Sequence, residues 1–220
     1  MDFHFITSIL PVLVRATGHT IVLSVLSLIA SLFLAVVISS VIYYNVKIIT
    51  PLLKVYVSFF RGTPALCQLY MIYFGLGNLG IPFFAKMSAY TAVVVALSLN
   101  MSAYMAENLR GALSSVDKGQ SEAGVSIGLD SMQIFSHIVF PQAFRVAIPS
   151  LGNSFVDLVK GSSMAFTIGV RELMASANLT GVATYKFFEA FFAAAIIYWI
   201  ITMFINLMQK RLEQYLNKAY

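Results

Sequence analysis

The chain has 220 residues, of which 59% are hydrophobic and only 10% are charged. Globular proteins carry about 25% charged residues, so the composition excludes an ordinary soluble domain and indicates a membrane protein. The net charge of +5 is weak evidence for nucleic-acid binding, because in a membrane protein the distribution of Lys and Arg matters more than their sum. The single cysteine, Cys67, excludes a disulfide or a paired-cysteine metal site within the chain.

Five apolar segments are long enough to cross a bilayer. A helix needs about 20 apolar residues to span the hydrocarbon core, and we predict spans over residues 18–44, 56–78, 88–106, 147–170 and 190–208. The sequence lacks the alternating pattern of membrane-spanning β-strands. It therefore predicts an all-α membrane protein with five transmembrane helices in a single domain, residues 1–220.

Basic residues are distributed unevenly around these spans. With the N-terminus outside, nine of the 14 Lys and Arg residues fall in cytoplasmic segments, four fall outside, and Lys160 lies at membrane depth. Because cytoplasmic loops carry an excess of Lys and Arg, we predict an outer N-terminus and a cytoplasmic C-terminus. The cytoplasmic group comprises Lys47, Lys54, Arg61, Arg110, Lys118, Arg145, Lys210, Arg211 and Lys218.

The first three spans differ in their polar content. Apart from Gly18 and His19 at its start, the first holds hydrophobic and hydroxyl residues, which is compatible with a lipid-facing helix. The second contains Thr63-Pro64 near its cytoplasmic end, and we predict a bend there because Pro64 has no N–H and tends to kink or start a helix. In the third, Asn100 and Ser102 favour helix packing over ligand contact, since polar residues commonly serve packing in membrane helices.

A polar loop containing several glycines, between residues 107 and 149, interrupts the apolar pattern. Its segment from Glu122 to Asp130 reads EAGVSIGLD. Ser121 and Glu122 predict the start of a short amphipathic helix with a carboxylate in its first turn, and Gly128 is typical of a residue that ends a helix. The predicted orientation puts this loop in the cytoplasm.

The fourth span places an acid and a base inside the membrane. Asn153, Asp157 and Lys160 recur at spacings of three and four residues, so they share one helix face, which Met164 continues. Such charges rarely face lipid, which favours a cavity or a partner subunit as their environment. The alternative is that Asp157 and Lys160, one turn apart, only neutralise each other.

The polar loop resembles the EAA loop of ABC-transporter permeases. That pattern is Glu-Ala-Ala, three residues, Gly, nine residues and Ile-x-Leu-Pro. The same spacing joins the segments 122–124, 128 and 138–141 here, with Gly124 and Phe140 as mild departures. Further blocks resemble the polar amino-acid uptake branch, the His/Glu/Gln/Arg/cystine permease group. These blocks cover residues 60–64, 103–107, 110–112, 119–120, 141–143 and 160–163.

The resemblance implies a type I ABC importer permease fold and a transport subunit that is not an enzyme. Two five-helix permeases, the same or homologous, would form the pathway in a bacterial cell membrane. Two ATPase subunits would bind from the cytoplasm and drive alternating access, and an external or periplasmic substrate-binding protein would deliver an amino acid. ATP and Mg would be bound by the ATPase, with no cofactor in this chain and no nucleic acid as partner.

The same resemblance implies that residues 114–141 form the cytoplasmic coupling loop, whose helix lodges in a groove of the ATPase. The short side chains of this segment would let a partner approach closely, while its acidic residue would dock or cap the helix. The coupling residues would be Glu122, Ala123, Gly124, Gly128 and Asp130.

The substrate is expected to be a zwitterion. It needs a donor for its carboxylate and an acceptor for its ammonium group, which Lys160 and Asp157 offer. Gly161 departs from the family's Lys-Asp-(Thr/Ser)-Ser block, which argues against a long cationic side chain. The resemblance is strongest to cystine-type members, so L-cystine or another neutral polar amino acid is the first choice. The candidate substrate-binding residues are Arg61, Thr63, Gln68, Asn153, Ser154, Asp157, Lys160, Gly161 and Ser162.

Two other functions fit the sequence less well. A membrane-embedded enzyme is disfavoured because His4, His19 and His137 lie far apart and no paired-acid or nucleophile pattern appears. An ATP-independent secondary transporter or channel with Asp157 as ion relay would not need a coupling loop. The sequence leaves open whether the permease pairs with itself or with a sister subunit.

Overall fold

The structure is a computed structural model that describes residues 1–79, 84 and 86–217. Lys218, one of the predicted cytoplasmic basic residues, lies outside these residues. All regular elements in this part of the chain are helical, and η1 and η2 are π-helices while η3 is a 3₁₀-helix. The elements are α1 (Phe3–Tyr43), α2 (Ile49–Gly62), α3 (Ala65–Tyr70), η1 (Met71–Gly75), α4 (Leu76–Asn78), α6 (Ala89–Ser115), α7 (Lys118–Ser126), α8 (Ser131–Ile134), η2 (Phe135–Val139), α9 (Phe140–Gly161), η3 (Ser162–Ile168), α10 (Leu173–Thr184) and α11 (Phe187–Asn217).

Among the described residues, four helical segments are long and apolar enough to cross a membrane: α1, α6, Ser131–Ile168 and α11. The predicted span over residues 56–78 is broken instead. Pro64 has no N–H to continue α2, which ends at Gly62, and the chain restarts as α3. The all-α membrane fold is therefore confirmed, while the count of five spanning helices is approximate.

Helix α1 packs along α6 and buries a stripe of small hydroxyl side chains. Thr20, Ser24, Ser27 and Ser31 are each 0% exposed. Two of them reach α6, because the backbone carbonyl of Ser27 accepts a hydrogen bond from Ser98 and the Ser31 hydroxyl lies 3.4 Å from the sulfur of Met105. Small side chains allow membrane helices to approach closely. The expectation of a lipid-facing helix is therefore wrong for this face of α1.

The N-terminus is tied to the corner between α10 and α11. Asp2 caps α1 by accepting a hydrogen bond from the N–H of Phe5. Its carboxylate also lies 2.6 Å from Nζ of Lys186, and its own N–H donates to Glu189. Helix α1 thus begins at Phe3, well before the span predicted to start at residue 18, and its first turns pack beside α10 and α11.

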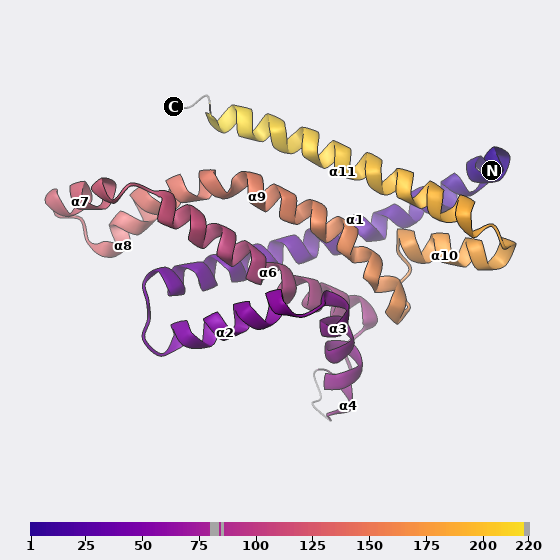
Figure 1. Ribbon diagram of the computed structural model, residues 1–220, viewed down its shortest axis with the longest axis horizontal. Coiled ribbons are helices and arrows are strands. Elements are labelled where there is room, and N and C mark those ends of the chain that lie inside the picture. Colours follow the sequence, from indigo (N-terminus) through magenta and orange to yellow (C-terminus); the bar gives the residue numbers. More distant parts are fainter. Residues whose placement is uncertain (80–83, 85, 218–220) are drawn as a thin grey trace.

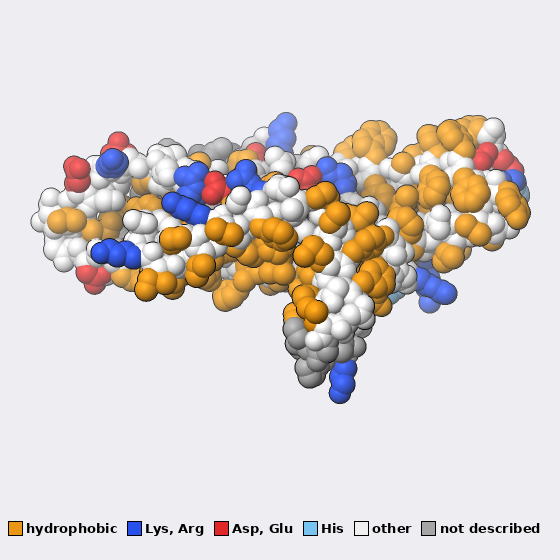
Figure 2. Space-filling view, turned by 60° about the horizontal axis from the view of Figure 1, so that its bottom comes forward, with side chains coloured by type: hydrophobic (Ala, Val, Ile, Leu, Met, Phe, Trp, Pro, Cys, Tyr) orange, Lys and Arg blue, Asp and Glu red, His pale blue; other side chains and the backbone are white. Residues whose placement is uncertain are grey.

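The two ends of the molecule differ in character. In Figure 1, α7 and α8 lie at one end of the long axis, while α10 and the N-terminus lie at the other. Figure 2 shows hydrophobic side chains over much of the visible face and charged side chains gathered mainly over the half that carries α7 and α8. This arrangement fits a helical bundle that crosses an apolar layer and presents a polar loop beyond it.

Candidate functional site

A cavity of about 510 Å³ opens between α6, α9 and the start of α3. On α6, its lining includes Asn100, Tyr104 and Asn108, which follow one another at the four-residue spacing of one helix face. The facing side of α9 also contributes polar groups. Four of the predicted substrate-binding residues line this cavity, namely Asn153, Ser154, Asp157 and Gly161.

Asp157 and Lys160 form the ion pair that the sequence left as an alternative. Nζ of Lys160 lies 2.8 Å from Oδ1 of Asp157, and the two side chains are 58% and 57% exposed. Lys160 borders a second cavity of about 390 Å³, which Ser163 and Tyr198 also line. An exposed ion pair contributes only about 0–1 kcal/mol, so a second cation that enters the first cavity competes with Lys160 for Asp157 at little cost.

Ser162 and Arg61 do not line the first cavity. Ser162 is 0% exposed, and its hydroxyl donates to the carbonyl of Val159. Arg61, at the end of α2, lies with its guanidinium carbon 5.6 Å from the ring centroid of Tyr104 and with Nη1 3.7 Å from the Glu107 carboxylate. Since Tyr104 is part of the cavity wall, Arg61 contacts that wall without lining the cavity itself.

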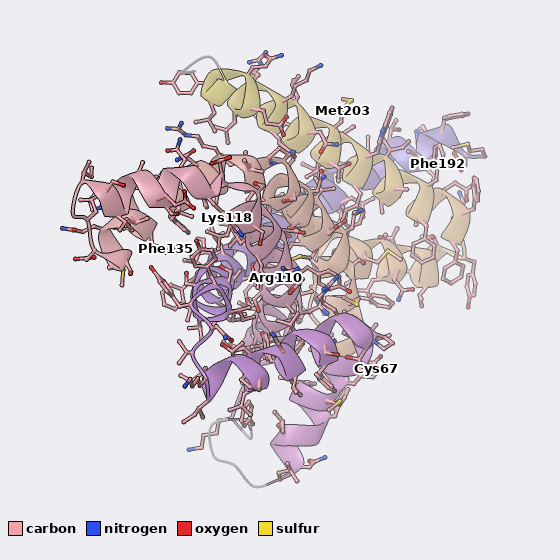
Figure 3. All side chains as sticks on the ribbon, turned by 60° about the vertical axis from the view of Figure 1, so that its left-hand side comes forward. Cys67, Arg110, Lys118, Phe135, Phe192 and Met203 are labelled. Atoms are coloured by element: carbon pink, nitrogen blue, oxygen red, sulfur yellow. The ribbon has the colours of Figure 1, made fainter. Side chains whose placement is uncertain are left out.

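Glu107 is itself held by a stronger partner. Its carboxylate accepts three hydrogen bonds from the Nε and Nη2 atoms of Arg110, at 3.0–3.2 Å. Figure 3 labels Arg110 on α6, together with Lys118 at the start of α7 and Cys67 on α3. The cluster of Arg61, Glu107 and Arg110 therefore joins the end of α2 to α6 just beyond the cavity.

Thr63 and Gln68 make hydrogen bonds to backbone carbonyls at the break between α2 and α3. The hydroxyl of Thr63 donates to the carbonyl of Phe59 at 2.8 Å. Gln68 is 2% exposed, and its Nε2 lies within hydrogen-bond distance of the carbonyls of Phe60 (3.0 Å) and Thr63 (3.1 Å). Neither side chain lines the cavity between α6 and α9. Direct contact of these two side chains with substrate therefore stays a prediction.

The predicted coupling helix is α7, and it begins earlier than expected. Asp117 caps it by accepting a hydrogen bond from the N–H of Gly119 at 2.6 Å, a role that short acidic side chains fill well. Glu122 therefore lies in the middle of α7, and the expectation of a carboxylate in its first turn is wrong. Gly128 follows the helix with a positive φ of 82°, a conformation that glycine adopts without strain, so its role in ending the helix is confirmed.

Gly124 packs inside the loop. It is the buried residue of α7, and a Cβ at this position would lie 2.8 Å from Cγ1 of Ile134 and 3.2 Å from Cδ1 of Ile138. The small size of Gly124 thus closes α7 onto α8 and η2 and does not create outer space for a partner backbone. Glu122 and Ala123 remain exposed.

Asp130 organises the second part of the loop. Its carboxylate accepts hydrogen bonds from the N–H groups of Met132 and Gln133, and Oε1 of Gln133 accepts from the N–H of Asp130, which forms a reciprocal capping box. The outer surface of the loop carries large apolar side chains. These are Val125 (65% exposed), Ile127 (76%) and Met132 (66%).

A buried carboxylate that no sequence pattern marked lies between α1, α10 and α11. Glu172 is 0% exposed and caps α10 by accepting from the N–H groups of Met174 and Ala175. It also accepts from the hydroxyls of Tyr198 at 2.8 Å and Thr20 at 3.3 Å. Burial raises the pKa of Glu172, and these hydrogen bonds oppose that shift. The available signal was an acidic residue directly before an apolar helix.

The chain is similar to known transport proteins over its whole length. Residues 27–218 match the family described as binding-protein-dependent transport system inner membrane component. The chain is 40% identical over 219 residues to the probable amino-acid ABC transporter permease protein PatM of Vibrio harveyi, covering 100% of this chain and 98% of that relative. It is 34% identical over 221 residues to the L-cystine transport system permease protein TcyL of Bacillus subtilis, covering 97% and 92%.

A solved structure agrees with these relatives. The chain matches a protein in the crystal structure of an amino acid ABC transporter with histidines, with a TM-score of 0.89, 31% identity and coverage of 98% of this chain and 99% of that one. A secondary transporter or channel is not favoured by these likenesses. The chain therefore belongs to the family of binding-protein-dependent transport system inner membrane components and is a permease subunit of an ATP-driven importer, with ATP hydrolysis in a separate ATPase subunit.

Proposed function

We propose that this permease carries a neutral polar amino acid, with L-cystine as first candidate, and that the cavity between α6 and α9 is part of its path. The observation that carries the proposal is Asp157, an exposed carboxylate in a cavity otherwise lined by amides, hydroxyls and apolar groups. A carboxylate at this place offers an acceptor for a substrate ammonium group. Lys160, which borders the second cavity, offers a charged donor for a substrate carboxylate once it is released from Asp157.

Position 161, where the family commonly has an acidic residue, is a glycine here, and this favours a substrate with a neutral side chain. Gly161 lines the cavity and adds no charge to it. A long cationic substrate brings a net positive charge, whereas the described lining of this cavity holds one carboxylate, Asp157, whose charge Lys160 already balances. The similarity to TcyL, named as an L-cystine permease, supports the choice of cystine for the first test.

The loop from α7 to α8 is proposed as the contact with the ATPase, which binds ATP and Mg. Exposed apolar side chains in water mark protein contacts when they gather in one place, and Val125, Ile127 and Met132 gather on this loop. Glu122 and Ala123 border the same outer surface of α7. The predicted orientation, with the N-terminus outside, puts this end of the molecule in the cytoplasm, and the binding protein would act from the opposite side.

The test uses the complex of this permease with its ATPase, its binding protein and, where one exists, a sister permease. The purified complex is placed in vesicles, and uptake of L-cystine, L-glutamine, L-arginine and L-histidine is measured with and without ATP. A thermal-shift panel of the same amino acids on the binding protein gives an independent ranking. We expect ATP-dependent uptake of L-cystine or L-glutamine and little uptake of L-arginine. Preferred uptake of L-arginine, or uptake that does not need ATP, would contradict the proposal.

A further inference from the structure

The end of α2 leaves several backbone carbonyls without helical partners. Pro64 has no N–H, so the carbonyl of Phe60, four residues earlier, lacks its usual donor. In a membrane, such a group must find another partner. Side chains donate hydrogen bonds to the other free carbonyls. The hydroxyl of Thr63 donates to the carbonyl of Phe59, and the hydroxyl of Tyr104 donates to the carbonyl of Arg61 at 3.4 Å.

Two amide side chains meet at the carbonyl of Phe60. Nε2 of Gln68 lies 3.0 Å from this oxygen, and Nδ2 of Asn100 lies 3.1 Å from it. A carbonyl oxygen only accepts hydrogen bonds, so both amides must turn their NH₂ groups toward it. Thr63 fixes the Gln68 amide in the same way, because its carbonyl and its hydroxyl oxygen, which lie 3.1 Å and 2.7 Å from Nε2, both accept from it. The orientation of both side chains therefore follows from the broken backbone.

Gln68 then fixes the second hydrogen of Asn100. Oε1 of Gln68 accepts from Nδ2 of Asn100 at 2.9 Å, so both hydrogens of that NH₂ group are used. Oδ1 of Asn100 has no hydrogen-bond partner among the described residues, and it is not an enclosed atom. Because Asn100 lines the cavity between α6 and α9, this oxygen is the free acceptor that the residue offers there.

We propose that Gln68 is a positioning residue, which holds Asn100 so that its carbonyl oxygen faces the cavity and accepts a hydrogen bond from the substrate ammonium group. This inference rests on the proposed amino-acid transport. Asp157 on α9 and Asn100 on α6 then provide two acceptors from different helices in one cavity. An ammonium group has three N–H donors, so it can use both. Gln68 acts without touching substrate, since it is 2% exposed and does not line this cavity.

A double-mutant cycle tests this assignment. Gln68→Met, Asn100→Ala and the double variant are assembled with wild-type ATPase and binding protein in vesicles. L-cystine and L-glutamine are the probes, and both uptake and ATP hydrolysis are measured. We expect each single variant to lower uptake per ATP about tenfold, the worth of a hydrogen bond to a charged group. The double variant should be no worse than Asn100→Ala alone, because Gln68 acts through Asn100.

The control pairs Gln68→Met with Ile127→Ala, a change on the distant outer surface of the coupling loop, and there the two effects should multiply. If Gln68→Met does not assemble, Gln68→Glu is used, which keeps the size and the acceptor but removes the NH₂ donors. Multiplying effects of Gln68 and Asn100 would overturn the positioning role, as would equal losses of uptake and ATP hydrolysis in the single variants. If wild-type vesicles take up none of the panel of four amino acids, the proposed function fails first, and the two failures are thereby distinguished.

Discussion

Gly124 lies against Ile134 so closely that a Cβ on the glycine would stand 2.8 Å from Cγ1 of the isoleucine. This contact closes α7 onto α8, and Gly124→Ala must push the two helices apart. Overpacking of this kind costs about 1–3 kcal/mol. We expect faster hydrogen exchange of residues 118–139. We also expect less of the ATPase subunit to remain bound to the permease in the purified complex.

Gly111→Ala is the matched control for that substitution. Gly111 lies in α6, and a Cβ there would meet no atom within 4 Å. Since alanine is about 1 kcal/mol better than glycine inside a helix, this variant should be as stable as the wild type or more so and should keep its ATPase. Equal behaviour of the two variants would show that the Gly124 contact has no special role.

Asp157→Asn tests the acceptor in the cavity. The change keeps the size of the side chain but removes the charge that Lys160 now pairs with at 2.8 Å. Because the pair is exposed, its loss should change the free energy of unfolding by less than about 1 kcal/mol. Uptake should fall about tenfold or more, since a hydrogen bond to a charged group is lost. The measurement is initial uptake in vesicles, with the amount of assembled complex as reference.

Lys160→Met distinguishes two roles for this ion pair, mutual neutralisation and contact with substrate. If Lys160 only neutralises Asp157, the double variant with Asp157→Asn should recover wild-type uptake. If the two residues contact substrate, the double variant should transport no better than Asp157→Asn. Wild-type uptake by Asp157→Asn itself would remove Asp157 from the substrate path.

The buried carboxylate of Glu172 predicts a pH-dependent stability. Burial raises its pKa above the ordinary value of 4.5, so the folded state binds the proton more tightly than the unfolded state. The stability contributed by this group is fully present below pH 4.5 and is lost as the pH rises through the higher folded pKa. We expect thermal unfolding of the wild type in detergent to move to lower temperature over that window, relative to Glu172→Gln.

Tyr198→Phe provides the control for this pH dependence. It removes a hydrogen bond that favours the ionised carboxylate of Glu172, so the folded pKa should rise further. The loss of stability should then extend to higher pH than in the wild type. A difference between wild type and Glu172→Gln that stays constant across the whole pH range would contradict a raised pKa.

The fold was predictable where apolarity alone decides it. The segment 190–208 lies within α11, and the segment 88–106 lies within α6 except for Ser88, which is the N-cap, because long apolar runs in lipid must form helices. The shared face of Asn153 and Asp157 followed from helical spacing and does line a cavity. Both results need only residues that are close together in the sequence.

The remaining features depend on contacts between distant residues. The break at Pro64 was marked in the sequence, but its partner Asn100 lies on another helix and was assigned to packing. Glu172 meets Thr20 across 152 positions of the chain, which no local pattern indicates. The short side chain of Gly124 predicts close approach of the ATPase, whereas the structure uses this glycine for an internal contact with Ile134. Side-chain partners of this kind follow from tertiary packing, which spacing does not encode.

Tyr185 predicts a gain in stability on substitution. It caps α10 with φ 59° and ψ 14°, a left-handed conformation that costs residues other than glycine about 1–2 kcal/mol, whereas asparagine adopts it more readily. Since the residue is 87% exposed, Tyr185→Asn gives up little packing and should raise the unfolding temperature in detergent by about 2–4 °C. Tyr215→Asn is the control, because Tyr215 is 76% exposed within the regular helix α11 and carries no such strain. A lower unfolding temperature for Tyr185→Asn, equal to that of the control, would mean that Tyr185 makes a stabilising contact that outweighs its strain.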